Sequence, residues 1–163
     1  MFFNHRMSFM LGLAAVVALV GANKDASANT LEVTATVPDS CTVDGGTLAF
    51  GTVDPSASTP IATGQININC TSAADDVDVT LDAGLHDGDA GNGRAMKRTT
   101  SNDYLNYKLY ANSSYSQEWA QDVSTRHDLA SGPNAIPVYG RIDQQNKPGG
   151  DYADTIQITL TFN

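Results

Sequence analysis

The chain has 163 residues, a formal net charge of −9 and 41% hydrophobic residues. This length accommodates one domain with a modest core and leaves no room for a second domain. Its 9 basic residues are scattered along the chain, so no clustered positive surface could neutralise phosphates. We therefore expect no nucleic-acid partner.

The first residues are typical of an export signal. Arg6 gives a weakly basic start, residues 9–20 form an apolar run too short to span a bilayer, and residues 26–28 supply the small side chains that a signal peptidase accepts. We therefore predict a cleaved signal peptide over residues 1–28. The alternative is an uncleaved membrane anchor, but no basic stop-transfer cluster follows Val20.

A strand-like segment follows the predicted cleavage site. Residues 30–37 alternate apolar and polar positions, which places four apolar side chains on one face: Leu31, Val33, Ala35 and Val37. This segment can be detached without cutting into the rest of the domain. We therefore predict a donor-strand segment over residues 29–38 and a single domain over residues 39–163.

The mature chain contains two cysteines, Cys41 and Cys70. In an oxidising compartment they are expected to form one intramolecular disulfide. A metal site is the weaker interpretation, because neither cysteine has a CxxC partner and the mature chain has only His86 and His127. We expect no metal and no cofactor.

The remaining pattern predicts about seven strands and no helix. Alternating or apolar strand segments are separated by loops that are rich in Gly, Asp, Pro and Ser, and no apolar stripe has helical spacing. The sequence therefore predicts an all-β, immunoglobulin-like β-sandwich. Short apolar or strand segments are expected at residues 48–51, 65–70, 77–81, 104–110, 138–142 and 156–162, and long surface loops at residues 82–102 and 113–137.

The last predicted strand occupies the end of the chain. Residues 156–162 alternate as a half-buried strand does, and no later strand follows to cover its free edge. One end of the domain is thus a strand short, while the segment at residues 30–37 is a spare strand. This combination favours polymerisation by strand exchange between copies over catalysis.

Three motifs that could indicate metal binding or catalysis are incomplete in this sequence. The acidic run at residues 87–93 lacks the Gly and bidentate Glu that a calcium loop requires at its sixth and twelfth positions. A hydrolytic triad has no G-x-S-x-G elbow, and the paired carboxylates needed for glycoside hydrolysis are not placed across a cleft. We do not expect an enzyme.

A carbohydrate platform is the one small-ligand hypothesis that we retain. Tyr110, Tyr115 and Trp119 could stack on sugars if they were exposed. Ordinary packing of these rings in the core or in loops is the alternative, and we favour it.

Several passages, in chain order, resemble the spore coat protein U domain, the subunit family of archaic chaperone–usher pili of the Csu type. The most specific are the passages at residues 104–110 (YLNYKLY), 137–142 (PVYGRI) and 150–155 (GDYADT), and the passages at residues 41–43, 48–51 and 66–71 also match. The resemblance spans nearly the whole mature chain. Residues 83–102, rich in Asp and Gly, are the region about which it says least.

The resemblance implies an incomplete immunoglobulin-like sandwich that lacks its final strand. A periplasmic pilus chaperone would lend that strand, and at the outer-membrane usher the N-terminal segment of the next subunit would replace it, either another copy of this chain or a related pilin. The acceptor groove would then include the apolar face of the last strand, which comprises Ile156, Ile158, Leu160 and Phe162.

The expected product is an extracellular pilus that supports adhesion and biofilm formation. A one-domain chain with a donor-like segment favours a shaft or minor subunit over a tip adhesin. The alternatives are a component of another extracellular or spore coat, and a free lectin-like binding module.

Overall fold

The computed structural model describes residues 31–36, 40–86 and 93–163. The chain divides into two units, Met1–Thr36 and Val37–Asn163. In the first unit, residues 31–36 are exposed and form no regular secondary structure. The described part of the strand predicted over residues 30–37 therefore forms no strand here, since a strand requires a hydrogen-bonded neighbour. The predicted signal peptide lies outside the described residues.

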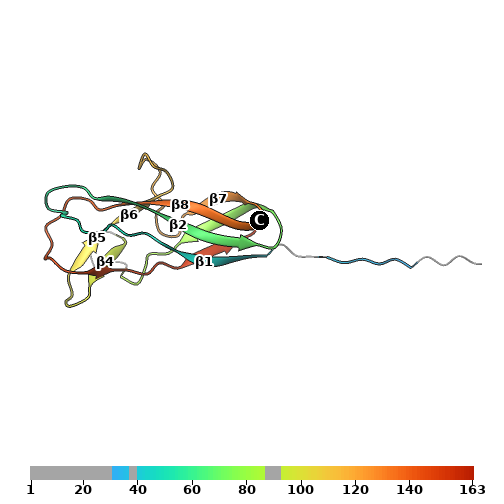
Figure 1. Cartoon of the computed structure of the whole chain (residues 1–163), viewed down its shortest axis with the longest axis horizontal. Coiled ribbons are helices and arrows are strands. Elements are labelled where there is room, and N and C mark those ends of the chain that lie inside the picture. Colours follow the sequence, from blue (N-terminus) through green and yellow to red (C-terminus); the bar gives the residue numbers. More distant parts are fainter. Residues whose placement is uncertain (1–30, 37–39, 87–92) are drawn as a thin grey trace, which may run out of the picture. The chain divides into compact units, whose positions relative to one another are not determined.

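The second unit is built from antiparallel sheets, with no helix among its described residues (Figure 1). Its largest sheet has the spatial order β1 (Cys41–Thr47), β2 (Ile61–Cys70), β8 (Gly132–Arg141) and β6 (Lys108–Tyr110). A second sheet has the order β10 (Ile158–Thr161), β3 (Ala74–Leu81) and β7 (Ser124–Leu129). A small third sheet contains β5 (Tyr104–Asn106), β4 (Ala95–Arg98) and β9 (Tyr152–Ala153).

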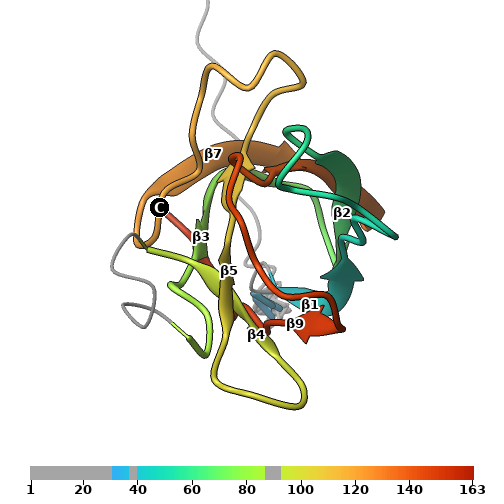
Figure 2. The same cartoon turned by 90° about the vertical axis from the view of Figure 1, so that its left-hand side faces the viewer.

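The core lies between the first two sheets. Ile66 and Ile68 on β2 are buried, as are Val77, Val79 and Leu81 on β3, and together they belong to one apolar cluster. The end-on view shows β1 and β2 on one side of the interior and β3 on the other (Figure 2). Alternation along these strands therefore sends apolar side chains inward from both sheets, as the sequence predicts.

The loop predicted over residues 82–102 contains a strand. β4 pairs with both β5 and β9, and Ala95 at its start is fully buried. The guanidinium of Arg94, just before β4, donates hydrogen bonds to the backbone carbonyls of Leu81, Asp82 and Trp119. These bonds compensate for the burial of a polar side chain, so this polar sequence enters the interior. Residues 87–92, which hold most of the acidic run, lie outside the described residues.

The prediction of a loop over residues 113–137 is also wrong in part. It contains β7 and the first residues of β8. Trp119 is completely buried, and its ring lies 6.1 Å from that of His127 on β7, centroid to centroid. Tyr110 is also buried, so Tyr110, Tyr115 and Trp119 form no exposed aromatic platform. β7 was missed because it lies at a sheet edge, where polar side chains are tolerated on the outer face.

The strand predicted over residues 104–110 is divided at Tyr107. β5, before this residue, pairs with β4 in the small sheet, whereas β6, after it, pairs with β8 in the large sheet. The predicted inward face is nevertheless correct, because Leu105, Tyr107 and Leu109 are all buried. The chain therefore changes sheets without changing the direction of its apolar side chains.

Candidate functional site

Two sheet edges on the same side of the domain lack a neighbouring strand among the described residues. β1 pairs only with β2, and β10 pairs only with β3. A strand with one unpaired side presents free N–H and C=O groups, which are a template for another strand. The two edges therefore delimit the place where the sandwich is open.

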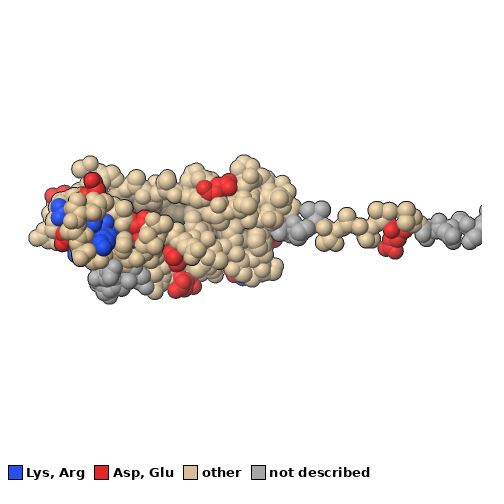
Figure 3. Space-filling view, turned by 90° about the horizontal axis from the view of Figure 1, so that it is seen from below, with Lys and Arg blue, Asp and Glu red and all other residues tan. Residues whose placement is uncertain are grey.

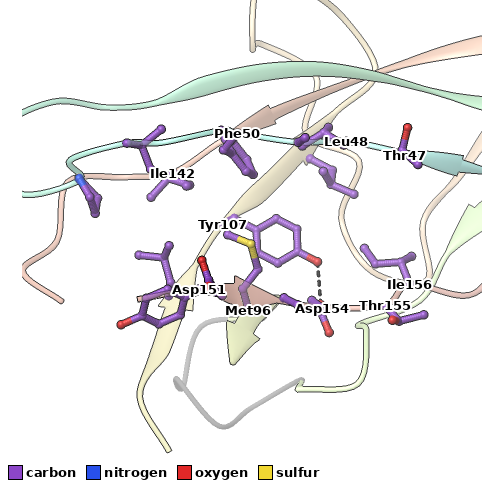
Figure 4. Close-up of a pocket in the computed structure, with 18 of the residues that line it drawn as sticks. Thr47, Leu48, Phe50, Met96, Tyr107, Ile142, Asp151, Asp154, Thr155 and Ile156 are labelled. Atoms are coloured by element: carbon purple, nitrogen blue, oxygen red, sulfur yellow. Dashed lines mark hydrogen bonds between the residues drawn. The ribbon is translucent and has the colours of Figure 1, made fainter. Parts of the chain in front are cut away.

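A groove of about 1020 Å³ lies along this open side. One wall is the segment at residues 46–55, which continues from β1, and the other is the segment at residues 147–156, which leads into β10. Figure 4 shows Leu48 and Phe50 on one side, Ile156 on the other, and the ring of Tyr107 between them. The groove is thus bounded by segments that are distant in sequence.

The lining of the groove is mainly apolar. Leu48, Phe50 and Ile156 are half-buried against the core, and the ring of Phe50 meets that of Tyr107 edge to face with centroids 6.5 Å apart. In the view from below, the Lys and Arg atoms gather at the end that carries β4 and β5, and most of the remaining surface is uncharged (Figure 3). Apolar contact is therefore the main attraction that the groove offers.

Two glycines make room for the first wall. A Cβ atom on Gly64 would lie 2.8 Å from the Cβ of Leu48, and one on Gly140 would lie 2.7 Å from Cζ of Phe50. Both distances are too short for a real side chain, so these strands need glycine where Leu48 and Phe50 pack onto them. Leu48 and Phe50 therefore lie directly on the large sheet.

A polar contact joins the floor of the groove to its second wall. Tyr107 Oη donates a hydrogen bond to Asp154 Oδ2 at 2.7 Å (Figure 4). Burial and this hydrogen bond to Asp154 raise the pKa of Tyr107, so the phenol stays protonated and acts as the donor.

Burial also lowers the pKa of Arg94, whose guanidinium contacts backbone carbonyls rather than a carboxylate.

The predicted disulfide between Cys41 and Cys70 is confirmed. It joins directly opposed residues at the start of β1 and the end of β2. Beside it, the backbone N–H and the hydroxyl of Thr71 both donate to the carbonyl of Ser40, at 2.8 and 3.1 Å. The beginning of the edge strand β1 is therefore held covalently to the body of the large sheet.

The predicted acceptor residues do not all reach the groove. Ile156 and Ile158 line it. Leu160 is half-buried farther along β10 and outside the lining, and Phe162, after the end of β10, is 44% exposed. The apolar alternation therefore continues beyond the residues that line the groove, and the role of Leu160 and Phe162 as acceptor residues stays a prediction.

The predicted donor residues are exposed where they are described. The side chains of Leu31 and Val33 are 88% and 83% exposed, and Ala35 is exposed as well. Val37 lies outside the described residues. The described apolar side chains of this segment, at alternate positions, are therefore exposed to solvent.

Sequence reasoning missed much of the groove. Met96, Tyr107 and Ile142 line it but come from three separate segments of the chain. The apolar stretch at residues 48–51 was recognised, and its alternation was the available signal for Leu48 and Phe50. No sequence signal shows that these segments converge with residues 154–158.

Residues 31–36, 40–86 and 93–163 contain no group of three or more His, Cys, Asp or Glu side chains that could hold a metal ion. Within the same ranges, no helix is long and apolar enough to cross a membrane.

The fold resembles that of a chain in a solved chaperone–subunit complex. A chain of the crystal structure of the CsuC–CsuE chaperone–tip adhesion subunit pre-assembly complex, from archaic chaperone–usher Csu pili of Acinetobacter baumannii, matches with a TM-score of 0.51 and 21% identity. The match covers 78% of the present chain and 41% of that chain, so the present chain spans about two fifths of its length. This likeness supports an immunoglobulin-like sandwich.

Sequence comparison is more specific. Protein U of Myxococcus xanthus is 33% identical over 166 residues, which cover 91% of the present chain and 92% of that protein. The model of the Spore Coat Protein U domain matches residues 27–159. The chain therefore belongs to the Spore Coat Protein U domain family.

Proposed function

We propose that the chain is a structural subunit that polymerises by donor-strand exchange. The N-terminal segment of one copy, with Leu31, Val33, Ala35 and Val37 on one face, enters the groove of another copy between β1 and β10. The observation that carries this proposal is the apolar groove between the segment that continues from the edge strand β1 and the segment that leads into the edge strand β10. An inserted strand would cover both the free backbone groups and the apolar lining.

The energetics favour a stable joint. Burial of Leu31, Val33 and Val37 contributes roughly 1.5 to 3 kcal/mol for each side chain, and backbone hydrogen bonds add to this. In the free chain, Leu31 and Val33 are almost fully exposed, so nearly their whole apolar surface remains available for burial. A joint of this kind should dissociate very slowly.

The proposed assembly route is the chaperone–usher pathway. Before polymerisation a periplasmic chaperone covers the groove, and an outer-membrane usher then exchanges the chaperone strand for that of another subunit. The product is a cell-surface pilus that supports adhesion and biofilm formation. Family membership and the fold shared with a chain of a chaperone–subunit complex support this route.

Deletion of residues 29–37 tests the proposal. The variant should still fold with its chaperone but should not donate a strand, because the deletion removes the donor and leaves the groove intact. The measurement is the ladder of heat-sensitive multimers on gels of unboiled sample, with chaperone complexes run in parallel. Glu32→Gln, on the opposite face of the segment, is the matched control and should polymerise normally. Normal multimers from the deletion variant would refute strand donation by this segment.

A second candidate is a component of another extracellular or spore coat, which the family's description favours. Both candidates use the same groove but differ in the assembled object. Electron microscopy of cells with and without the gene distinguishes them. Filaments that disappear on deletion support the pilus, whereas loss of a surface layer supports the coat.

A further inference from the structure

The second wall of the groove crosses between two sheets. The chain leaves the small sheet after β9 and joins the second sheet at β10, and residues 154–157 lie between these strands. Here two aspartate side chains supply acceptors: Asp82 Oδ1 accepts from the N–H of Gln157 at 2.9 Å, and Asp154 Oδ1 accepts from the N–H of Leu85 at 3.0 Å. The crossover is therefore held largely by carboxylates.

Backbone contacts reinforce the same crossover. The N–H of Leu85 also donates to the carbonyl of Thr155, and the N–H of Asp82 donates to the carbonyl of Gln157, both at 3.1 Å. Asp82 Oδ1 accepts a further hydrogen bond from the N–H of Gly84 at 2.9 Å. Residues 82–85 thus support the outside of the wall.

Asp154 also reaches inward across the groove. Its Oδ2 accepts the hydrogen bond from Tyr107, the residue at which the chain passes from the small sheet to the large sheet. The backbone N–H of Tyr107 donates to the carbonyl of Arg94 at 3.1 Å, which fixes the base of the tyrosine. The Tyr107–Asp154 bond therefore joins the two points at which the chain changes sheets.

The surrounding loop is shaped to fit this carboxylate. Gly84 has a φ of +85°, and a Cβ atom there would clash with Asp154 Oδ2. Any other residue would displace the carboxylate from Tyr107. Close packing on this side and a hydrogen bond on the other leave Asp154 a single position.

We propose that Asp154 and Tyr107 are positioning residues, which hold the wall at residues 154–158 at a set separation from the floor before any strand enters. This proposal rests on strand acceptance by the groove, as proposed above. Preorganisation raises affinity because the ordering of the wall is completed before binding. Without this bond the wall relaxes toward the apolar floor, and an incoming strand has to reopen it.

Binding of a labelled peptide of residues 29–37 to the mature chain measures this effect directly. Tyr107→Phe keeps the ring and removes only the hydroxyl. We expect affinity about tenfold weaker, which corresponds to about 1.4 kcal/mol. Tyr139→Phe is the matched control, because Tyr139 lies on β8 and does not line the groove. That variant should bind within about twofold of the parent.

Urea unfolding with and without peptide separates positioning from simple stabilisation. A bond that merely stabilises the fold lowers both midpoints equally and leaves the peptide affinity unchanged, because its contribution cancels between the free and bound states. A positioning bond reduces the stabilisation that the peptide confers. Asp154→Asn provides the same test if Tyr107→Phe is not recovered in folded form.

The outcomes distinguish this proposal from the one on which it rests. If the parent chain does not bind the peptide, strand acceptance itself is refuted. If the parent binds it and both Tyr107→Phe and Asp154→Asn bind equally well, positioning is refuted and strand acceptance stands. Weaker binding by these variants, with unchanged binding by Tyr139→Phe, supports positioning.

Discussion

The closed and open sides of the sandwich satisfy their backbone groups in different ways. On the closed side, β2 pairs with β8 over ten consecutive residue pairs, from Ile61 opposite Arg141 to Cys70 opposite Gly132. On the open side, β1 and β10 each have one partner, and an apolar groove lies between the segment that follows β1 and the segment that precedes β10. Substitutions on the closed side should therefore affect folding, and substitutions on the open side should affect partner binding.

The largest effect is expected from Ile68→Asp on the closed side. Ile68 is 1% exposed, so the carboxylate would be buried without a partner and should cost about 3 to 5 kcal/mol. The folded variant should be lost whether or not a donor strand is supplied. Urea unfolding measures this, and Thr63→Asp on the exposed face of the same strand is the control. If Ile68→Asp unfolds at the same urea concentration as the parent, the comparison between the closed and open sides is contradicted.

A charge on the open side should act differently. Ile158 is half-buried at the groove, where an aspartate would remain partly solvated in the free domain but would become buried beneath an inserted strand. Ile158→Asp should therefore fold yet fail to co-purify with the chaperone or to form multimers. Thr159→Asp, on the exposed face of β10, should co-purify with the chaperone and form multimers as the parent does. Normal co-purification of Ile158→Asp would remove this residue from the acceptor site.

Loss of the disulfide should have an intermediate effect. In the chain-entropy model, closing a loop with a sequence separation of 29 residues stabilises the fold by about 3 to 4 kcal/mol. Replacement of both Cys41 and Cys70 by Ser should lower the urea midpoint and the yield of subunit. Peptide binding at low temperature should persist, because neither cysteine lines the groove. An unchanged midpoint would show that β1 is held mainly by its hydrogen bonds.

The smallest effect is expected at His127 on β7, away from the groove. Burial lowers the pKa of His127 below its ordinary value, with a smaller opposing effect from Asp128. The unfolded chain therefore binds the proton more readily, and His127 costs stability as the pH falls below about 6.5. The melting temperature of the parent should decrease more between pH 7.5 and pH 5.5 than that of His127→Gln. Equal decreases would assign the acid sensitivity to other groups.

The closed side was largely predictable from the sequence, because its strands bury alternate apolar residues. The segments at residues 65–70 and 77–81 lie within β2 and β3 with the predicted faces inward. β7 was missed because it lies at a sheet edge, where polar side chains are tolerated. β4 was missed because it follows Arg94, whose buried guanidinium is satisfied by backbone carbonyls. At sheet edges and next to buried polar side chains, a polar sequence is therefore a poor sign that a strand is absent.

The groove was predictable only in part. Alternation identified Ile156 and Ile158, and the predicted export signal with two cysteines led to the disulfide. The meeting of Phe50, Met96 and Tyr107 depends on where the chain changes sheets, which no local pattern records. Long-range topology, rather than residue type, determines which apolar side chains line an open site.

The disulfide also determines how mechanical load enters the domain. A pull on the segment before Cys41 reaches the domain at this residue, and the covalent bond passes it to Cys70 on β2. β2 lies inside the large sheet, between β1 and β8, so the force bypasses the hydrogen bonds of the edge strand. With the disulfide reduced, the same pull would open the β1–β2 ladder from its end, one pair at a time. Single-molecule pulling should therefore show a lower yield force after reduction.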